Sequence, residues 1–408
     1  MARRILYLSQ WFWPEPGARG LKVAHDLKAR GYEVEVLTGF PNYPSGKLAK
    51  GYRLSPYMRE TLEELTVHRV FLYPSHDRSS LGRALNYLSF FVSAFLFCLL
   101  RSGRFDLIYV YHPPITTGLA AALAGLVWRK PFILEVQDLW PDSVAASGMS
   151  ATGTLARILD PICRFVYKRA ALVLGQSEGM AARLVERGVA LERADVFFNW
   201  ADEDAARANG LYDTASLNFE GRFNFVYAGN LGTVQALEVL IEAAHSLADA
   251  APHIQLTLIG DGAERARLEA LVRDRSVRNV QILPGVPPSQ IGDVLAAADV
   301  LVVHLKDDPL FEITIPSKTQ FYLAMGRPVL IGVSGEAARI VTRAGAGIAV
   351  PPENGEAMAQ AMLQMANLPQ AERKAMGDRG RATYESRFAF TSTMDRIAGH
   401  VGRLMDVG

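Results

Sequence analysis

The sequence predicts an α/β fold made of two Rossmann-like, doubly wound domains, each built on a parallel β-sheet. Three observations support this prediction. The chain has 408 residues, which is too long for one typical hydrophobic core and suits two domains. Short apolar, β-branched runs alternate with helical segments, a pattern typical of parallel sheets covered on both faces. The pattern also restarts after a polar stretch in mid-chain.

The expected strands are short apolar runs, each followed by a segment with a helical pattern. In the first half of the chain they fall within residues 3–9, 32–39, 105–114, 130–138 and 170–177. In the second half they fall within residues 223–230, 254–262, 279–286, 298–305, 327–333 and 346–352. Because parallel strands end at one edge of their sheet, the loops that follow them are where a ligand is expected.

The polar stretch ADEDAARANGLYDTASLNFEGR, residues 201–222, carries no apolar periodicity and divides the two strand series. We therefore expect an N-terminal domain over residues 1–200 and a C-terminal domain over residues 201–385. A terminal helix over residues 386–408 can pack on either domain, including back on the N-terminal one. Two such domains facing each other would form a cleft.

Composition narrows the class of protein. A net charge of +1 gives no argument for a nucleic-acid partner. The two cysteines, Cys98 and Cys163, are far apart in apolar surroundings and match no metal-ligand spacing. We interpret them as buried thiols in a reducing compartment, with no metal site. The apolar run near the start is cut short by Pro14 and Pro16, which argues against a signal peptide.

The segment ALNYLSFFVSAFLFCLL, residues 84–100, is almost wholly apolar. Arg78 and Arg83 precede it, and Arg101 and Arg104 follow it. Seventeen residues is about the lower limit for spanning a bilayer. Three interpretations stay open: a helix buried in the core, a helix lying in the membrane interface with arginines on anionic headgroups, and a membrane span.

Two loops of the first domain could carry function. Gly17 precedes a helix, where free backbone N–H groups suit an anion or a sugar hydroxyl, although an ordinary strand-to-helix turn explains it equally well. Asp138, Trp140 and Asp142 follow the strand within 130–138. A carboxylate there could accept hydroxyl hydrogen bonds, and Asp142 with Ser143 could instead cap a helix.

Glycines follow two strands of the second domain. Gly229 and Gly232 stand between a strand and a helix, as in half of a phosphate-binding loop. Gly260 and Gly262 stand similarly, with Arg265 where a third glycine would be. Neither pair completes a dinucleotide fingerprint, and each pair alone is a weak signal.

The loop after the strand within 298–305 holds Glu312, Pro316, Ser317 and Lys318 before an apolar helix. Pro316 suits the first helical turn, and Ser317 suits an N-cap. A lysine at a helix N-terminus is locally unfavourable, so a bound anion would explain Lys318. A solvated glutamate and a surface lysine are the alternative.

Seven motifs together resemble the family-4 retaining glycosyltransferases of GT-B fold. They are YEVEVLTGFPNYPSG, EVQDLWPDS, LVLGQSEGMAARL, FFNWAD, FVYAGNLGTVQAL, LIGDGAE and IPSKTQFYLAMGRPVL, and they cover nearly the whole chain. The chain is most similar to the bacterial branch that builds colanic acid and O-antigen with fucosyl or N-acetylfucosaminyl-type sugars. The resemblance implies a nucleotide-sugar substrate, retention of configuration, and neither a cofactor nor a metal.

The resemblance also implies roles for individual residues. Glu312 matches the first acid of the family's paired-acid motif, which contacts donor hydroxyls, whereas the second acid, which binds ribose, is replaced by Gln320. The family's usual arginine and lysine are replaced by Asn230 and Gln235. Lys318 is therefore expected to neutralise the pyrophosphate, and Asp138 is the candidate carboxylate of the first domain. The remaining positions expected to bind the donor are Gly17, Gly229, Asn230, Gly232, Gly260, Asp261, Gly262, Gly285, Val286, Ile315, Pro316, Ser317 and Gln320.

The function that the resemblance implies is transfer of a sugar from a UDP- or GDP-sugar to a lipid-linked oligosaccharide in cell-surface polysaccharide biosynthesis. The N-terminal domain would bind the acceptor, and the enzyme would work in the cytoplasm at the inner face of the plasma membrane. A nucleotide-sugar 2-epimerase of the same fold and a nicotinamide-dependent oxidoreductase are the alternatives. The apolar segment 84–100 disfavours the epimerase, and the incomplete glycine pattern disfavours the oxidoreductase.

Overall fold

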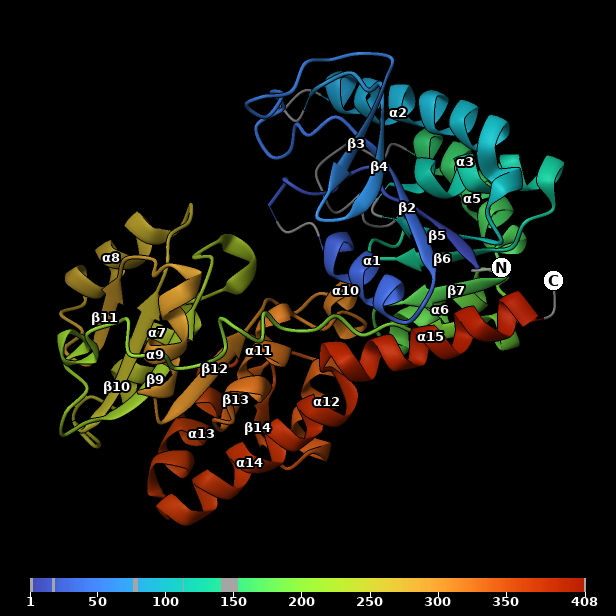
Figure 1. Ribbon diagram of the computed structural model, residues 1–408. Coiled ribbons are helices and arrows are strands. Elements are labelled where there is room, and N and C mark those ends of the chain that lie inside the picture. Colours follow the sequence, from blue (N-terminus) through green and yellow to red (C-terminus); the bar gives the residue numbers. More distant parts are fainter. Residues whose placement is uncertain (1–2, 17–18, 76–79, 113, 141–152, 407–408) are drawn as a thin grey trace. The chain divides into compact units, whose positions relative to one another are not determined.

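A computed structural model describes residues 3–16, 19–75, 80–112, 114–140 and 153–406. The chain divides into two compact units, which are described separately (Figure 1). Unit 1 comprises Met1–Phe197 and Met394–Gly408, and unit 2 comprises Phe198–Thr393.

Unit 1 is built on an eight-stranded sheet in the order β3-β4-β2-β1-β5-β6-β7-β8. The strands are β1 (Arg4–Leu8), β2 (Glu33–Gly39), β3 (Tyr57–Leu62), β4 (Leu65–Val70), β5 (Leu107–His112), β6 (Phe132–Val136), β7 (Leu172–Gly175) and β8 (Ala194–Val196). The five strands predicted for this half are confirmed. The sequence analysis missed β3, β4 and β8. The hairpin β3-β4 is the antiparallel part of the sheet, and β3 has an exposed edge without an apolar run.

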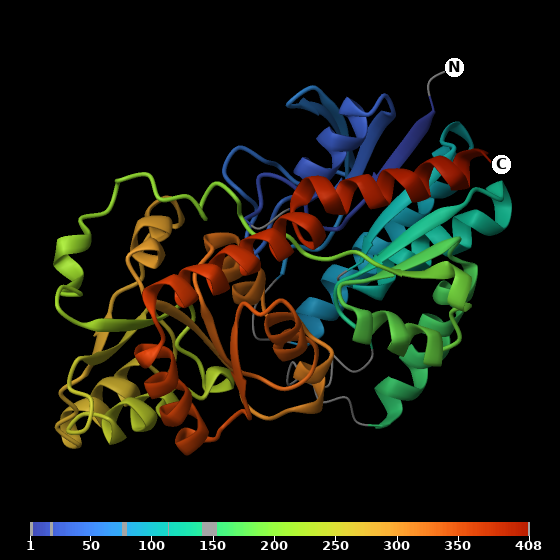
Figure 2. The same ribbon diagram turned by 90° about the horizontal axis from the view of Figure 1, so that it is seen from below.

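Helices cover the sheet of unit 1. They are α1 (Gly20–Ala29), α2 (Ser80–Arg101), α3 (Ile115–Trp128), α5 (Gly153–Arg169) and α6 (Glu178–Glu186), with the short 3₁₀ turns η1 (Ser102–Arg104) and η2 (Leu191–Arg193). The final helix, α15 (Phe390–Asp406), contributes its part from Met394 onward. The start of β1 and the end of α15 lie near each other (Figures 1 and 2), and there Arg3 pairs with Asp406.

Unit 2 is built on a six-stranded parallel sheet in the order β11-β10-β9-β12-β13-β14. The strands are β9 (Phe223–Ala228), β10 (Ile254–Ile259), β11 (Val280–Leu283), β12 (Val300–His304), β13 (Val329–Gly332) and β14 (Gly347–Val350). All six were predicted. The helices are α7 (Glu238–Ser246), α8 (Arg265–Asp274), α9 (Pro288–Ala296), α10 (Pro309–Glu312), α11 (Ser317–Met325), α12 (Glu336–Arg343), α13 (Gly355–Asn367) and α14 (Gln370–Arg387), with turns η3 (Thr214–Leu217) and η4 (Thr233–Gln235).

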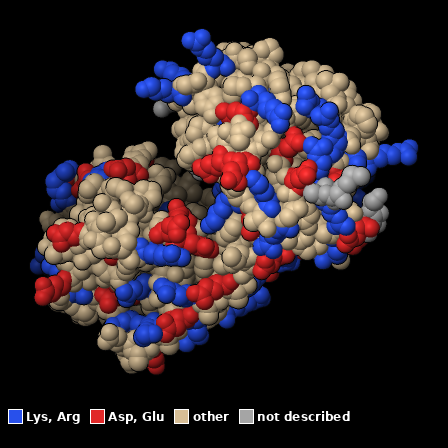
Figure 3. Space-filling view, in the orientation of Figure 1, with Lys and Arg blue, Asp and Glu red and all other residues tan. Residues whose placement is uncertain are grey.

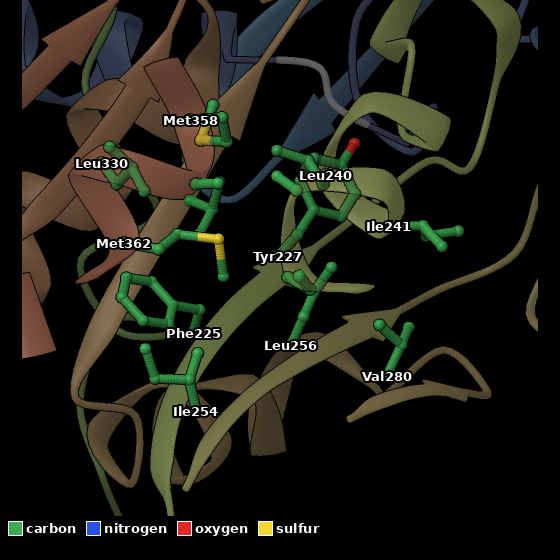
Figure 4. Packing of buried hydrophobic residues seen from close by; sticks show 14 of the residues in the cluster. Phe225, Tyr227, Leu240, Ile241, Ile254, Leu256, Val280, Leu330, Met358 and Met362 are labelled. Atoms are coloured by element: carbon green, nitrogen blue, oxygen red, sulfur yellow. The ribbon is translucent and has the colours of Figure 1, made fainter. Parts of the chain in front are cut away.

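The core of unit 2 forms where one face of this sheet meets α7 and α13. Phe225, Tyr227 and Leu256 from the strands pack with Leu240 from α7 and Met358 from α13 (Figure 4). Each of these side chains is at most 1% exposed, so their burial fixes the strand ends that carry the loops described below.

The apolar segment predicted at residues 84–100 lies within α2. Leu81–Arg104 is long and apolar enough to cross a membrane, and 28% of its most apolar window is buried. One face of α2 packs inward, whereas the outward face carries six exposed side chains: Leu81, Leu85, Leu88, Val92, Leu96 and Leu100. A helix buried in the core would be enclosed on all sides. α2 is not, and this counts against the core interpretation. Cys98 on its inner face and Cys163 are buried and form no disulfide, which confirms the prediction of buried thiols.

Candidate functional site

The sheet of unit 2 has a topological switch point between β9 and β12. Successive strands run outward from β9 through β10 to β11 and, on the other side, from β12 through β13 to β14. Loops on either side of such a point diverge and leave a crevice beyond the carboxyl ends of the strands. Gly229 follows β9 directly, and the loop carrying Lys318 follows β12.

A cavity of about 660 Å³ lies at these strand ends, within unit 2. Eight residues predicted to bind the donor line it: Gly229, Asn230, Gly260, Asp261, Gly285, Val286, Ser317 and Lys318. They come from the loops after four neighbouring strands, β9, β10, β11 and β12. The fold thus gathers residues that are up to 89 positions apart in sequence, Gly229 and Lys318, around one cavity.

The first two glycine loops pack backbone against backbone. Gly260 has φ +146°, and a Cβ on it would lie 1.9 Å from the carbonyl oxygen of Gly229. Gly229 itself has φ +141°, and a Cβ there would lie 2.6 Å from Nζ of Lys318. Both positions favour glycine by conformation, and at Gly260 the neighbouring backbone also leaves no space for a Cβ. The loops leave room for a ligand next to backbone atoms.

Gln235 fixes the shape of the loop after β9. Its Oε1 accepts hydrogen bonds from the backbone N–H of Gly232, at 3.1 Å, and from Nδ2 of Asn230, at 3.4 Å. The Tyr227 hydroxyl donates to the carbonyl oxygen of Asn230 at 2.7 Å. Asn230 and Gln235, which stand where the resemblance leads one to expect basic residues, thus order the loop here and supply no positive charge.

Lys318 supplies the positive charge of the cavity. It is the one Lys or Arg among the described residues that line it. Its Nζ lies 4.9 Å from the centroid of the Tyr227 ring. Within the described chain no carboxylate lies within ion-pair distance of this Nζ, and burial lowers the pKa of Lys318. A half-buried cation without a partner favours a bound anion.

The neighbouring arginine does not add to this charge. Arg265 donates through Nη1 to Oδ1 of Asp261 at 2.8 Å and through Nε to Oε1 of Glu269, also at 2.8 Å. It also donates to the carbonyl oxygen of Gly260 at 2.9 Å. Arg265 is therefore committed to neighbouring protein groups, and it holds Asp261 and the second glycine loop in place.

The helix that carries Lys318 begins at Ser317, so Pro316 lies just before the first turn that was predicted to contain it. Pro316, with φ −57° and ψ 134°, is the N-cap of α11, and Ser317 is the first helical residue. No side chain caps this helix, so the predicted N-cap role of Ser317 is wrong. The serine is exposed at the rim of the cavity instead. An uncapped first turn leaves backbone N–H groups for a ligand.

Glu312 ends α10 and is exposed, and it does not line the cavity. Its carboxylate makes no hydrogen bond to a described residue. Its backbone is held by Gly335, because a Cβ on Gly335, whose φ is +79°, would lie 2.1 Å from the carbonyl oxygen of Glu312. Gln320 is 2% exposed, and its buried Oε1 has no hydrogen-bond partner among the described residues. The other predicted positions outside the cavity wall are Gly232, Gly262, Ile315 and Pro316.

The sequence analysis missed the apolar wall of the cavity. Trp200 comes from the segment before unit 2's first strand, Pro288 and Ile291 come from α9, and Phe321 and Tyr322 come from α11. Trp200, Phe321 and Tyr322 lie within motifs quoted above but were assigned no role, and Pro288 and Ile291 lie outside those motifs. The turns of α9 and α11 bring the side chains of these two helices to one cavity. An apolar wall beside a cation suits a ligand with a flat ring and an anionic group.

The strand ends of unit 1 carry a second polar cluster. Glu135 in β6 is fully buried, accepts from the Tyr109 hydroxyl at 2.6 Å and from Nε2 of Gln137 at 2.6 Å, and lies near Arg19. Burial raises the pKa of Glu135 to about 7. Glu135 was not predicted as a site residue. Its signal in the sequence was a single acid inside an otherwise apolar strand.

Asp138 follows the same strand and is exposed. Trp140 follows it, and its ring centroid lies 6.1 Å from that of Tyr87. The predictions for Gly17, Asp142 and Ser143 fall outside the described residues. Among the residues that are described, no group of three or more His, Cys, Asp or Glu side chains could hold a metal ion.

Two family models match the chain, one in each half. Residues 16–200 match the glycosyl transferase 4-like domain, and residues 222–367 match the glycosyl transferases group 1. WcaI of Escherichia coli (strain K12), which is named for colanic acid biosynthesis and as a glycosyl transferase, is 30% identical over 365 residues. That match covers 84% of this chain and 86% of the relative. Alpha-D-kanosaminyltransferase of Streptomyces kanamyceticus is 24% identical over 61% of this chain and 65% of its own length.

Solved structures resemble the chain over almost its whole length. Anabaena Alr3699/HepE, in complex with UDP, has a TM-score of 0.69 at 17% identity and covers 99% of this chain and 100% of its own. A trehalose 6-phosphate synthase from Burkholderia multivorans has a TM-score of 0.71 at 16% identity and covers 100% of this chain and 97% of its own. At these identities the likeness concerns the fold.

Proposed function

Because this chain belongs to the family-4-like glycosyltransferases of GT-B fold, we propose that it transfers a hexosyl group from a UDP- or GDP-sugar to a lipid-linked glycan with retention of configuration. The product would be a cell-surface polysaccharide such as colanic acid, O-antigen or capsule. The similarity to WcaI supports this context. The UDP complex of a protein with the same fold supports the class of donor.

The observation that carries the proposal is the unpaired ammonium of Lys318 beside Gly229 at the switch point of unit 2. A nucleotide diphosphate offers the anion that this cation lacks. The apolar wall formed by residues such as Trp200 and Phe321 suits its base. Backbone N–H groups of the glycine loops and of the first turn of α11 would add hydrogen bonds to phosphate oxygens.

The chemistry follows from where charge develops. The bond between the sugar and the diphosphate breaks through an oxocarbenium-like state, while negative charge grows on the leaving phosphate. Lys318 and fixed N–H donors would stabilise that charge, and one well-placed donor contributes roughly 2.7–4 kcal/mol. Glu312 would hold hydroxyl groups of the donor sugar.

We propose attack of the acceptor on the same face from which the diphosphate leaves, which gives retention. The carboxylates that line the cavity in unit 2 are Asp202 and Asp261, and Arg265 holds Asp261. A phosphate oxygen of the leaving group would accept the proton of the acceptor hydroxyl. In unit 1, Asp138 is the candidate carboxylate on the acceptor side.

The lipid-linked acceptor places the enzyme at the inner face of the plasma membrane in this proposal. The exposed leucines of α2 support it, because a soluble surface rarely presents such a large apolar face. Arg83 and Arg101 near the ends of α2, and Arg104 after it, suit the anionic headgroups of the cytoplasmic leaflet.

The experiment is a screen of UDP- and GDP-sugars for thermal stabilisation, followed by an activity assay. A donor present at 100 times its dissociation constant adds about 2.7 kcal/mol of stability. Free nucleotide should then form only when a lipid-linked acceptor is supplied, and the new glycosidic bond should keep the anomeric configuration of the donor. Stabilisation by a nicotinamide cofactor instead, or an epimerised sugar formed without acceptor, would refute the proposal.

A further inference from the structure

Unit 1 contains a basic cavity of about 620 Å³ at the edge of its sheet where the strands begin. The starts of β1, β5 and β6, the turn η1 and the ends of α3 and α15 surround it. Substrate loops of doubly wound sheets lie at the opposite, carboxyl edge. The cavity is therefore separate from the strand ends considered above. Its charged lining residues are Arg3, Arg4, Arg104, Asp106, Arg129 and Lys130.

Three of these cations form no ion pair with a described acid. Asp106, the one carboxylate among the described lining residues, accepts a hydrogen bond from the backbone N–H of Arg4 at 2.8 Å. Arg3 pairs with Asp406, and Arg4 pairs with Glu35 at 2.6 Å. Arg104, Arg129 and Lys130 have no carboxylate within ion-pair distance among the described residues. Three positive charges that share one cavity repel each other, and an anion bound between them would relieve that repulsion.

The same end of unit 1 exposes an apolar surface. Leu100 at the end of α2 is 77% exposed, and Leu126, Val127 and Trp128 at the end of α3 are 51%, 60% and 41% exposed. The two helices lie side by side (Figure 1), and Nε1 of Trp128 donates to the carbonyl oxygen of Leu99 at 2.7 Å.

Trp128 connects the two features, because it also lines the basic cavity. In Figure 3 the surface over α2 is mostly tan, with blue Lys and Arg side chains at its margins. Exposed leucines, a tryptophan and cations thus follow one another along this surface. Groups at a bilayer interface lie in the same order, with aromatic rings at the level of the headgroups.

We infer that this cavity binds the phosphate of an anionic phospholipid while the leucines of α2 and the end of α3 enter the bilayer surface. The inference rests on the proposed function only in that both require membrane contact. The inference adds a preference for anionic over neutral headgroups, which apolar contacts alone do not produce. Arg104, Arg129 and Lys130 would contact the phosphate, and Trp128 would lie at the interface.

The test is flotation of the full chain with vesicles of phosphatidylcholine alone and with vesicles in which a quarter of the lipid is phosphatidylglycerol. The triple variant Arg104→Gln, Arg129→Gln, Lys130→Gln is compared with the wild type. A matched control, Lys47→Gln, Lys50→Gln, Arg53→Gln, removes three exposed cations elsewhere in unit 1. A thermal unfolding curve for each protein verifies folding.

We expect the wild type to prefer the anionic vesicles and the cavity variant to lose that preference. Binding should fall roughly 100-fold, as expected for three basic residues near an anionic surface. The binding of the control variant should fall by less than half as much, when the two fold-changes are compared as logarithms. Inorganic phosphate should fail to displace the wild type from anionic vesicles at millimolar concentration, since a single free phosphate lacks the apolar contacts.

Four results would overturn the inference. Equal losses in both triple variants would mean that net charge alone matters. A cavity variant that is merely less stable, with lipid preference intact, would mean that these cations only complement the C-terminal dipoles of α2 and α3. Displacement by inorganic phosphate would assign the cavity to a free anion. Binding to neutral vesicles that survives in every variant would leave the proposed membrane contact standing, whereas no binding to any vesicle would refute both.

Discussion

The ammonium nitrogen of Lys318 lies 4.9 Å from the centre of the Tyr227 ring. The ring belongs to the core of unit 2 and is fixed by its neighbours and by its hydroxyl's bond to Asn230 (Figure 4). The aromatic face therefore holds the cation beside Gly229 without neutralising it. This arrangement orders a positive charge before any ligand arrives, and the predictions below follow from it.

The first prediction concerns Gly229→Ala. The new Cβ would lie 2.5 Å from Cε of Lys318, so the lysine side chain must move, and the backbone at φ +141° is unfavourable for alanine. We expect donor affinity, measured by calorimetry, to fall roughly tenfold to 100-fold, as for a lost hydrogen bond to a charged group.

The matched control is Gly210→Ala in the same unit. Gly210 also has a positive φ, +73°, but a Cβ there would meet no atom within 4 Å. It should lose some stability and keep its donor affinity. Equal losses of affinity in both variants would show that backbone strain, not displacement of Lys318, is responsible.

The second prediction concerns Glu312→Gln. Because the carboxylate is exposed and contacts no described side chain, the change should not alter the free energy of unfolding. We expect kcat/KM for the nucleotide-sugar to fall roughly tenfold to 100-fold, with the affinity for free nucleotide diphosphate unchanged. Glu220→Gln, at another exposed acid of unit 2, is the control and should keep full activity. Unchanged kinetics in Glu312→Gln would remove this residue from the donor site.

The third prediction concerns pH and Glu135. The folded state keeps the proton of this carboxyl up to a pKa of about 7, whereas an ordinary glutamate releases it near 4.5. Between these values the folded state binds more protons, so stability falls as pH rises, by about 3 kcal/mol over the window. Glu135→Gln should flatten this slope in urea unfolding measured near pH 5 and near pH 7.5. The same slope in both proteins would mean that Glu135 is ionised in the fold.

Most of the fold could be predicted from local patterns. Most predicted strands are short apolar runs that are buried on both faces of a sheet, which is the condition under which such a run is diagnostic. The edge strands β11 and β14 are half-buried. The hairpin β3-β4 lacked this signal, because β3 alternates between exposed and half-buried side chains at the edge of the sheet. The roles of Pro316 and Ser317 at the start of α11 were misassigned, because proline suits both the N-cap and the first turn and serine is a common N-cap.

Likewise, only the part of the candidate site that has a local sequence pattern could be predicted. Glycines and Lys318 could be predicted from the sequence, because strand ends in a parallel sheet converge at one edge. The apolar wall contributed by α9 could not, since nothing in the sequence states which helix face turns toward that edge. The basic cavity of unit 1 likewise gathers residues from both ends of the chain, such as Arg4 and Leu404, which only the fold brings together.

The most direct test of the account is calorimetry of the wild type and Lys318→Ala with the nucleoside diphosphate found in the donor screen and with the corresponding nucleoside. Lys374→Ala, at a lysine of α14 that pairs with Asp378, is the control. The account predicts that Lys318→Ala weakens diphosphate binding roughly tenfold to 100-fold while nucleoside binding and the control stay unchanged. Diphosphate affinity that is intact in Lys318→Ala, or that falls equally with nucleoside affinity, would contradict it.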